Sequence, residues 1–267
     1  MNKSTLVIYH KNCPDGFGAA FAAWKRFKEK AIYHPAQYGD KPPYDECRGR
    51  DVFVLDFSYP REQLIHIYIN AQTLTVLNHH KTAQADLEDL SFATFSMIQS
   101  GAMLAWKHFV SQPVPRFIEY IQDRDLWKWE LTDSREFSAA LYSYPFDFAT
   151  WDSLYLDTDH LIAEGKAILR MKEKAVKEMA DRSVIGNVGG YMVPIVNATI
   201  FFSEVGEELC IRHPDKPFAA YYFDREDNRR QWGLRSRGDF DCSAVAKSYG
   251  GGGHPGAAGF TALREEP

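Results

Sequence analysis

The sequence lacks the features of a membrane or exported protein. No apolar run among its 267 residues approaches the ~20 residues that a membrane-spanning helix needs. The apolar stretch near the N-terminus is short and soon turns polar, which indicates a first strand rather than a signal peptide. We therefore expect no membrane association, and the cytoplasm is the expected compartment.

Paired cysteines and excess positive charge are also missing. The four cysteines form no CxxC pair, which argues against a disulfide framework or a zinc knuckle. The net charge of -5 argues against electrostatic capture of long nucleic acid, so we expect no long duplex partner. It leaves room for a short or mononucleotide substrate in a local basic pocket.

Short apolar runs alternate with helical stretches in the first third of the chain. "TLVIYH" (5–10), "DVFVLDFSYP" (51–60) and "LTVLN" (74–78) have the composition of strands. A helix that begins after Ser100 is expected to be capped by its hydroxyl. Alternation of this kind predicts an α/β fold with a parallel, doubly wound sheet.

A long amphipathic stretch then separates two regions of different composition. The predicted division is an N-terminal domain over 1–157, a connecting helix over 158–182 and a smaller α/β domain with a mixed sheet over 183–267. The active site is expected in the cleft between the two domains.

Polar side chains stand at the ends of three predicted strands. His10 ends the first, Asp56 follows the second, and Asn78 ends the third and precedes His79 and His80. Sites in open parallel sheets lie outside the carboxyl ends of the strands, so these groups should converge. The alternatives are an Asp that only caps a helix and a pair of solvated loop histidines.

Two further acidic segments could join them. Asp15 lies in a Pro-Asp-Gly turn after His10, and "QDRDLW" offers Asp123 and Asp125 after an apolar helix. His and Asp donors suit Mn²⁺, Mg²⁺ or Zn²⁺. An ordinary turn and a helix C-cap or surface pair are the competing interpretations.

The glycine run "GGGGHPGAAG" (250–259) lets backbone amides approach a phosphate closely. It lacks the Gly-Lys-Ser/Thr ending of a P-loop. Arg235 and Arg237 could add guanidinium contacts to an anion. A flexible linker and an exposed strand edge are the alternatives.

Together, "HKNCPDG", "LDFSYP", "NHHK", "QDRDLW" and "GGGGHPGAAGF" resemble the DHH phosphoesterase family with its associated C-terminal domain. The order of these motifs matches over almost the whole chain. The resemblance implies a hydrolase that holds two Mn²⁺ ions, or Mg²⁺ or another divalent ion, and binds substrate through its second domain. A homodimer is compatible with it.

The resemblance also implies roles for individual residues. The implied metal ligands are His10, Asp15, Asp56, Asn78, His79 and Asp123, with Asp125 as the alternative to Asp123. The implied catalytic group is Asn78, His79 and His80. The implied substrate contacts are Arg235, Arg237, Gly251, Gly252, Gly253 and His254.

Two positions depart from the family pattern. Cys13 and Asn78 stand where family members commonly carry Asp. Loss of a ligand carboxylate weakens divalent binding. The leading hypothesis is a phosphodiesterase or exonuclease acting on short oligonucleotides or small nucleotides, such as nanoRNA, pAp or linearised cyclic dinucleotides. The alternatives are a nucleotide or cyclic-dinucleotide binding protein with impaired catalysis, and a pyrophosphatase-like phosphatase.

Overall fold

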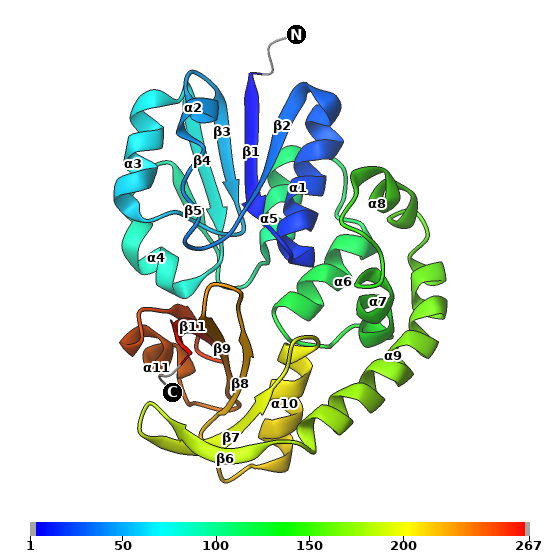
Figure 1. Ribbon diagram of the computed structural model, residues 1–267. Coiled ribbons are helices and arrows are strands. Elements are labelled where there is room, and N and C mark those ends of the chain that lie inside the picture. Colours follow the sequence, from blue (N-terminus) through cyan, green and yellow to red (C-terminus); the bar gives the residue numbers. More distant parts are fainter. Residues whose placement is uncertain (1–3, 265–267) are drawn as a thin grey trace. The chain divides into compact units, whose positions relative to one another are not determined.

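Five parallel strands form the sheet of the N-terminal part of the chain (Figure 1). The computed structural model describes residues 4–264. The strands lie in the order β2-β1-β3-β4-β5, so the winding reverses between β1 and β3. Their bounds are Thr5–His10 (β1), Ala31–Ala36 (β2), Asp51–Leu55 (β3), Thr73–Asn78 (β4) and Ala93–Phe95 (β5). The predicted doubly wound sheet is confirmed, and its reversal point is where a ligand crevice is expected.

Helices cover both faces of this sheet (Figure 1). On one face lie α1 (Pro14–Phe27) and α5 (Gly101–Phe109), and the same core extends to α6 (Arg116–Asp125), α7 (Ser134–Leu141) and α8 (Phe148–Leu154). On the other lie α2 (Tyr44–Cys47), α3 (Arg61–Asn70) and α4 (Lys81–Leu87). Successive strand residues alternate between the faces: Leu6 and Ile8 pack on the second set of helices and Val7 on the first.

The turn between β1 and α1 is tight. Asn12 adopts a left-handed conformation (φ 59°), and Pro14 opens the helix. A Cβ on Gly16 would lie 2.1 Å from the carbonyl oxygen of His10, so only glycine fits there. The turn therefore folds Cys13 and Asp15 back toward the end of β1.

A second sheet of six strands forms in the C-terminal part. Its order is β10-β11-β9-β8-β7-β6, antiparallel except for β7 and β8. The elements are β6 (Val184–Val188), β7 (Tyr191–Asn197), α10 (Phe202–Arg212), β8 (Ala219–Asp224), β9 (Arg229–Arg235), α11 (Cys242–Ser248), β10 (Gly252–His254) and β11 (Ala257–Leu263). The predicted mixed sheet is confirmed. The glycine run is part of the β10–β11 pair and is not a flexible linker.

The chain divides into two compact units, Met1–Leu169 and Arg170–Pro267, within the long helix α9 (Thr158–Ala180). Leu161 of α9 packs in the core of the first unit and Val176 in that of the second. A short 3₁₀ turn, η1, spans Lys28–Lys30. The predicted domain limits at 157 and 183 stay predictions. Within residues 4–264, no helix has the length and apolarity to cross a membrane.

Candidate metal centre

Asp56 occupies the centre of the candidate site. It follows β3 in a left-handed conformation (φ 61°) and is almost fully buried. Its Oδ1 lies 3.0 Å from His79 Nε2, and its Oδ2 lies 3.6 Å from His10 Nδ1. A Cβ on Gly101 would come within 2.5 Å of the Asp56 Cβ, so glycine at that position is what lets α5 begin beside this carboxylate.

The donor atoms around Asp56 fall into two groups. Group A consists of His10, Cys13 and Asp56, and group B consists of Asp15, His79 and Asp125. In each group, one donor atom from each residue lies within 4.8 Å of the others. Because each oxygen of Asp56 contacts a different histidine, this carboxylate joins the two groups.

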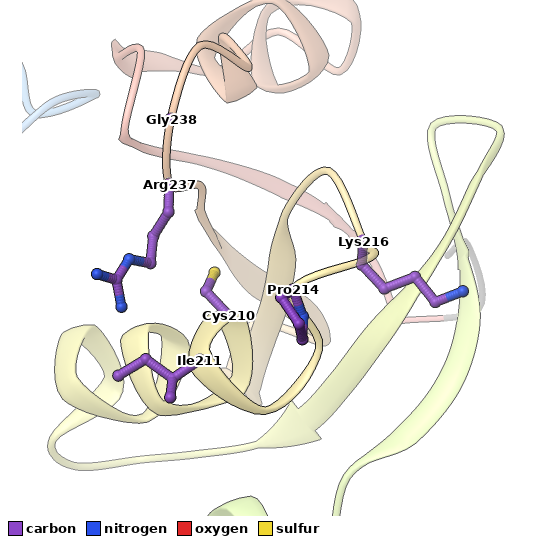
Figure 2. A pocket seen from close by; sticks show the side chains of 6 residues that line it. All are labelled: Cys210, Ile211, Pro214, Lys216, Arg237 and Gly238. Carbon is purple, nitrogen blue, oxygen red and sulfur yellow. The ribbon is translucent and has the colours of Figure 1, made fainter.

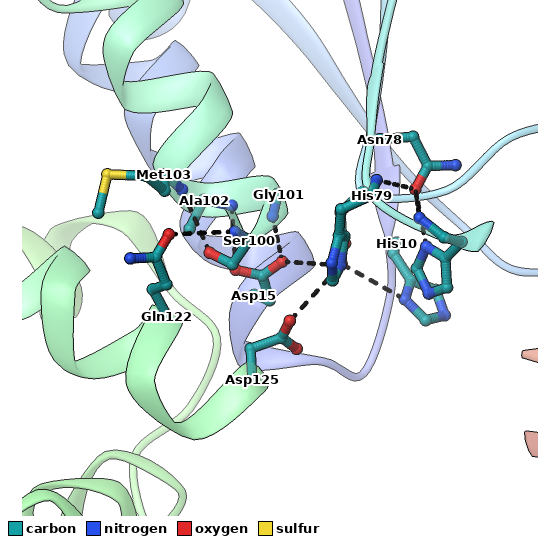
Figure 3. A network of polar contacts seen from close by, with 12 residues as sticks. His10, Asp15, Asn78, His79, Ser100, Gly101, Ala102, Met103, Gln122 and Asp125 are labelled. Carbon is teal, nitrogen blue, oxygen red and sulfur yellow. Dashed lines mark hydrogen bonds and ion pairs between the residues drawn. The ribbon is translucent and has the colours of Figure 1, made fainter. Parts of the chain in front are cut away.

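Asp15 is held by the first turn of α5 (Figure 3). Its Oδ2 accepts a hydrogen bond from Gly101 N at 2.6 Å, and its Oδ1 accepts one from Ala102 N at 3.0 Å. The predicted cap by Ser100 is confirmed, since its hydroxyl accepts from Met103 N. A helix N-terminus favours negative charge, so this arrangement fixes the Asp15 carboxylate in place.

His79 lies between the carboxylates of group B (Figure 3). Its Nε2 lies 3.7 Å from Asp15 Oδ2 and 3.5 Å from Asp125 Oδ2. Burial opposes protonation, but the charges of Asp125 and Asp56 outweigh it and raise the pKa of His79 to about 10.

The carboxylates respond to one another and to the histidines. Burial, with the charges of Asp125 and Asp56, raises the pKa of Asp15 well above its ordinary value. Burial acts in the same direction on Asp56, but hydrogen bonds from His10 and His79 prevail and hold the pKa of Asp56 far below its usual range. The cluster thus concentrates negative charge that its two histidines only partly offset.

This donor set fits divalent cations. Asp125 Oδ2 is buried and accepts no hydrogen bond within the described part of the chain. Carboxylate oxygens suit Mg²⁺ and Mn²⁺, and imidazole nitrogens suit Zn²⁺ and its neighbours. A cation would relieve the repulsion among Asp15, Asp56 and Asp125 and take this oxygen as a ligand.

Asn78 serves the turn in which it lies. Its Oδ1 accepts a hydrogen bond from His79 N at 2.7 Å (Figure 3). The same oxygen accepts one from His80 N at 3.2 Å and lies 2.7 Å from His80 Nδ1. These contacts orient both histidines. The assignment of Asn78 as a metal ligand stays a prediction.

The two acidic residues of "QDRDLW" have different surroundings. Asp125 belongs to group B. Asp123 Oδ1 accepts from Glu130 N at 2.9 Å, and its Oδ2 accepts from Leu131 N at 3.3 Å. Asp123 therefore closes the loop after α6, and the structure does not bring it into either group.

Tyr38 was not singled out by the sequence. This residue follows β2 in the chain and is 52% exposed. Its ring centroid lies 5.9 Å from those of His10 and His80. The ring of Phe57 lies edge-on to that of Tyr38, with 6.0 Å between the two ring centroids. Its only sequence signal is an aromatic residue shortly after a predicted strand.

The predicted substrate contacts all lie in the second unit. Arg235 and His254 both pair with Ala257, so they end the two strands that flank β11, β9 and β10, at the same end of the sheet. Arg235 is largely buried. Gly251 and Gly253 allow close backbone approach, because a Cβ would lie 2.1 Å from Gly259 O at the first and 2.5 Å from Ala257 O at the second.

Arg237 lines a separate cavity of about 360 Å³ (Figure 2). Cys210 and Lys216 lie in the same cavity, with Ile211, Pro214 and Gly238. Burial raises the pKa of the Cys210 thiol to about 11. Arg237 and Lys216 are the basic residues of this lining, and Lys216 Nζ lies 3.1 Å from Asp215 Oδ2.

Known proteins resemble the chain in sequence and fold. An uncharacterised protein of Acanthamoeba polyphaga mimivirus is 31% identical over 280 aligned positions, which cover 96% of this chain and 66% of that protein. Oligoribonuclease NrnB of Bacillus subtilis (strain 168) is 25% identical over 306 positions, covering 97% of this chain and 73% of that protein. The chain thus spans roughly two thirds to three quarters of the length of these relatives.

A solved structure shares the fold. The DHH domain of a protein described as a member of the s1p family of ribosomal proteins superposes with a TM-score of 0.60 at 12% identity, covering 98% of this chain and 83% of that chain. No family model matches the sequence. This shared fold is the one expected from the ordered strand-end motifs, which resemble those of the DHH phosphoesterase family.

Proposed function

We propose that the chain is a metal-dependent phosphodiesterase that hydrolyses short oligonucleotides or small nucleotides. One observation carries the proposal: the two oxygens of Asp56 face different histidines and so join groups A and B at the carboxyl edge of the sheet. Two adjacent cation sites are the arrangement that phosphoester hydrolysis uses. The relative named as an oligoribonuclease supports a short nucleotide substrate.

The residues of the cluster form two sets of ligands, one for each cation. His10, Cys13 and Asp56 would hold one cation, and Asp15, His79 and Asp125 the other, with Asp56 between them. Bound divalent cations lower the pKa of a water molecule and neutralise the charge that develops on the phosphoryl group. We assign Asp125 rather than Asp123 to the site, because the Asp123 carboxylate is engaged by loop amides.

His80 is placed to contact the phosphoryl group. Its Nδ1 lies 2.7 Å from Asn78 Oδ1, and this contact fixes the orientation of the ring. In its protonated form His80 would donate from Nε2 to a phosphoryl or leaving oxygen. Arg235, Arg237, Gly251, Gly252, Gly253 and His254 would hold the non-scissile part of the substrate.

The proposal is tested with a panel of substrates and metal-stripped protein. The panel contains 5′-phosphorylated diadenylate, a tetranucleotide, pAp, a linear and a cyclic dinucleotide, and pyrophosphate. We expect release of mononucleotides from the short linear substrates on addition of Mn²⁺. Hydrolysis of pyrophosphate alone would overturn the nucleotide assignment in favour of a pyrophosphatase-like enzyme.

Tyr38 is expected to stack on a base of the substrate, since its ring is exposed beside His10 and His80. Tyr38→Ala should raise KM for diadenylate by about 5- to 150-fold, because a stacked base contributes roughly 1–3 kcal/mol. Tyr38→Phe should retain the wild-type KM. Steady-state kinetics on diadenylate and on an abasic analogue check this, and an equal loss on the abasic analogue would refute stacking.

A second function, nucleotide binding without turnover, is favoured by one observation: Asn78 brings no carboxylate to the site, and its amide oxygen is engaged by its own turn.

Asn78→Asp keeps an oxygen for that turn and adds a second at the Nδ2 position. If the chain is an enzyme, this change should strengthen Mn²⁺ binding at least about tenfold, since opposite charges 4 Å apart interact by several kcal/mol. Calorimetry and turnover measure this; nucleotide binding with no hydrolysis in either form would establish the binding function.

A further inference from the structure

A sulfur atom distinguishes group A from group B. Group A combines the Cys13 thiol with an imidazole nitrogen of His10 and a carboxylate oxygen of Asp56, within 4.8 Å of one another. Group B has two carboxylates and one imidazole. Thiolate and imidazole ligands favour Zn²⁺ and Co²⁺, whereas carboxylates favour Mg²⁺ and Mn²⁺. The two groups therefore have different metal preferences.

The backbone holds Cys13 in group A. The left-handed Asn12 reverses the chain after His10, and Lys11 N donates to Ala36 O at 2.9 Å, which anchors the turn to β2. On the other side, Phe17 N donates to Cys13 O at 2.9 Å, which ties Cys13 to the first turn of α1. These two hydrogen bonds hold the backbone on both sides of Cys13, whose thiol lies within 4.8 Å of a His10 ring nitrogen.

We propose that group A is a site for a thiophilic divalent cation such as Zn²⁺ or Co²⁺, with Cys13 Sγ as a ligand, and that group B takes Mn²⁺ or Mg²⁺. The thiol passes its proton to solvent as the bond between sulfur and metal forms. The inference deepens the proposed function and rests on it for the second cation. The native chain then holds two cations of different kinds.

Cobalt reports directly on a sulfur ligand. Metal-stripped wild-type chain titrated with Co²⁺ should develop a sulfur-to-cobalt charge-transfer band in the near ultraviolet that saturates at one equivalent. Cys13→Ser, which keeps nearly the same shape, should lose the band. Its Co²⁺ affinity should fall at least about 100-fold, the upper end of what loss of a mere outer-shell partner costs.

Cys210→Ser is the matched control, because the Cys210 thiol donates to the carbonyl oxygen of Arg235 at 3.1 Å in the second unit and belongs to neither group. It should keep the band. A wild-type chain without the band, a band that survives Cys13→Ser, or one that is lost in Cys210→Ser would each overturn the proposal.

Cys13→Asp provides a second variant with an all-oxygen-and-nitrogen donor set. Competition between Zn²⁺ and Mn²⁺, followed by the paramagnetic resonance of Mn²⁺, should show its preference shifting toward Mn²⁺ by at least about tenfold relative to wild type. No shift would contradict a sulfur ligand. Turnover is measured separately. A cobalt band without hydrolysis of any substrate would refute the proposed enzymatic function but not the metal site. Hydrolysis with Mn²⁺ in the absence of a cobalt band would refute only the assignment of Cys13 as a ligand.

Discussion

Asp56→Asn is expected to lower kcat/KM by roughly 10³-fold, the largest effect of any single substitution in this chain. The Asn side chain has one oxygen and one NH₂ group. It can therefore offer an oxygen toward His79 or toward His10, but not toward both, as the Asp56 carboxylate does. Cations at a phosphoryl-transfer site contribute several kcal/mol, and about 4 kcal/mol corresponds to that loss. Steady-state hydrolysis of diadenylate with saturating Mn²⁺ measures it.

Asp51→Asn is the matched control for this substitution. Asp51 begins the strand that Asp56 follows, and it accepts a hydrogen bond from Thr73 Oγ1 at 2.8 Å. Since it lies at the opposite end of β3, its replacement should leave kcat/KM within about twofold, as surface changes usually shift stability by no more than ~0.5 kcal/mol. Asp56→Asn activity within tenfold of wild type would contradict the bridging role.

Asp125→Asn is expected to lower kcat/KM by at least about 100-fold and to weaken Mn²⁺ binding. The substitution removes one of two carboxylates of group B and leaves the charge of His79 less balanced. Loss of a single group that stabilises transition-state charge commonly costs 10²- to 10³-fold, so an effect of about this size is expected. Kinetics and Mn²⁺ titration on the same preparations provide the measurement.

Asp123→Asn is expected to lower the stability of the fold and to leave the activity nearly unchanged. Its carboxylate binds the amides of Glu130 and Leu131, and an Asn side chain places a donor against one of them. Unfolding free energy should fall by about 1–3 kcal/mol while kcat/KM stays near wild type. If Asp123→Asn abolished Mn²⁺ binding and Asp125→Asn did not, the assignment of group B would be wrong.

The parts of the fold that follow from local pattern could be predicted from the sequence. Apolar runs ending in His10, Asp56 and Asn78 marked three strands, and parallel pairing brings such ends to one edge. Ser100 was predictable as a cap because its hydroxyl precedes an amphipathic helix. The second sheet was expected from its β-rich composition.

Side-chain direction was not predictable in the same way. Asp123 and Asp125 lie two residues apart at the end of α6, where successive side chains turn by about 100° and so face different neighbours. No pattern in "QDRDLW" says which of them faces His79. Likewise, the left-handed Asp56 and the contact it makes with Gly101 depend on how α5 packs.

The roles of Asn78 and the glycine run depended on local backbone conformation that the sequence pattern does not specify. The sequence places an amide in front of two histidines, but only the folded turn shows that its oxygen accepts from both backbone amides. The segments that flank the glycines of 250–253 argued against a linker, but they did not show how the run is held. Close approach of Gly251 to Gly259 fixes them in a strand pair.

The central claim is that groups A and B, joined by Asp56, hold cations that drive phosphodiester hydrolysis. Its most direct test is the hydrolysis of 5′-phosphorylated diadenylate by metal-stripped chain, measured before and after Mn²⁺ is added. Parallel reactions receive Zn²⁺ or Co²⁺ together with Mn²⁺. We predict no mononucleotide before addition, steady release afterwards, and loss of release in Asp56→Asn. Release that persists in excess chelator, or no release with any of these ions in either the chain or its Asn78→Asp variant, would contradict the claim.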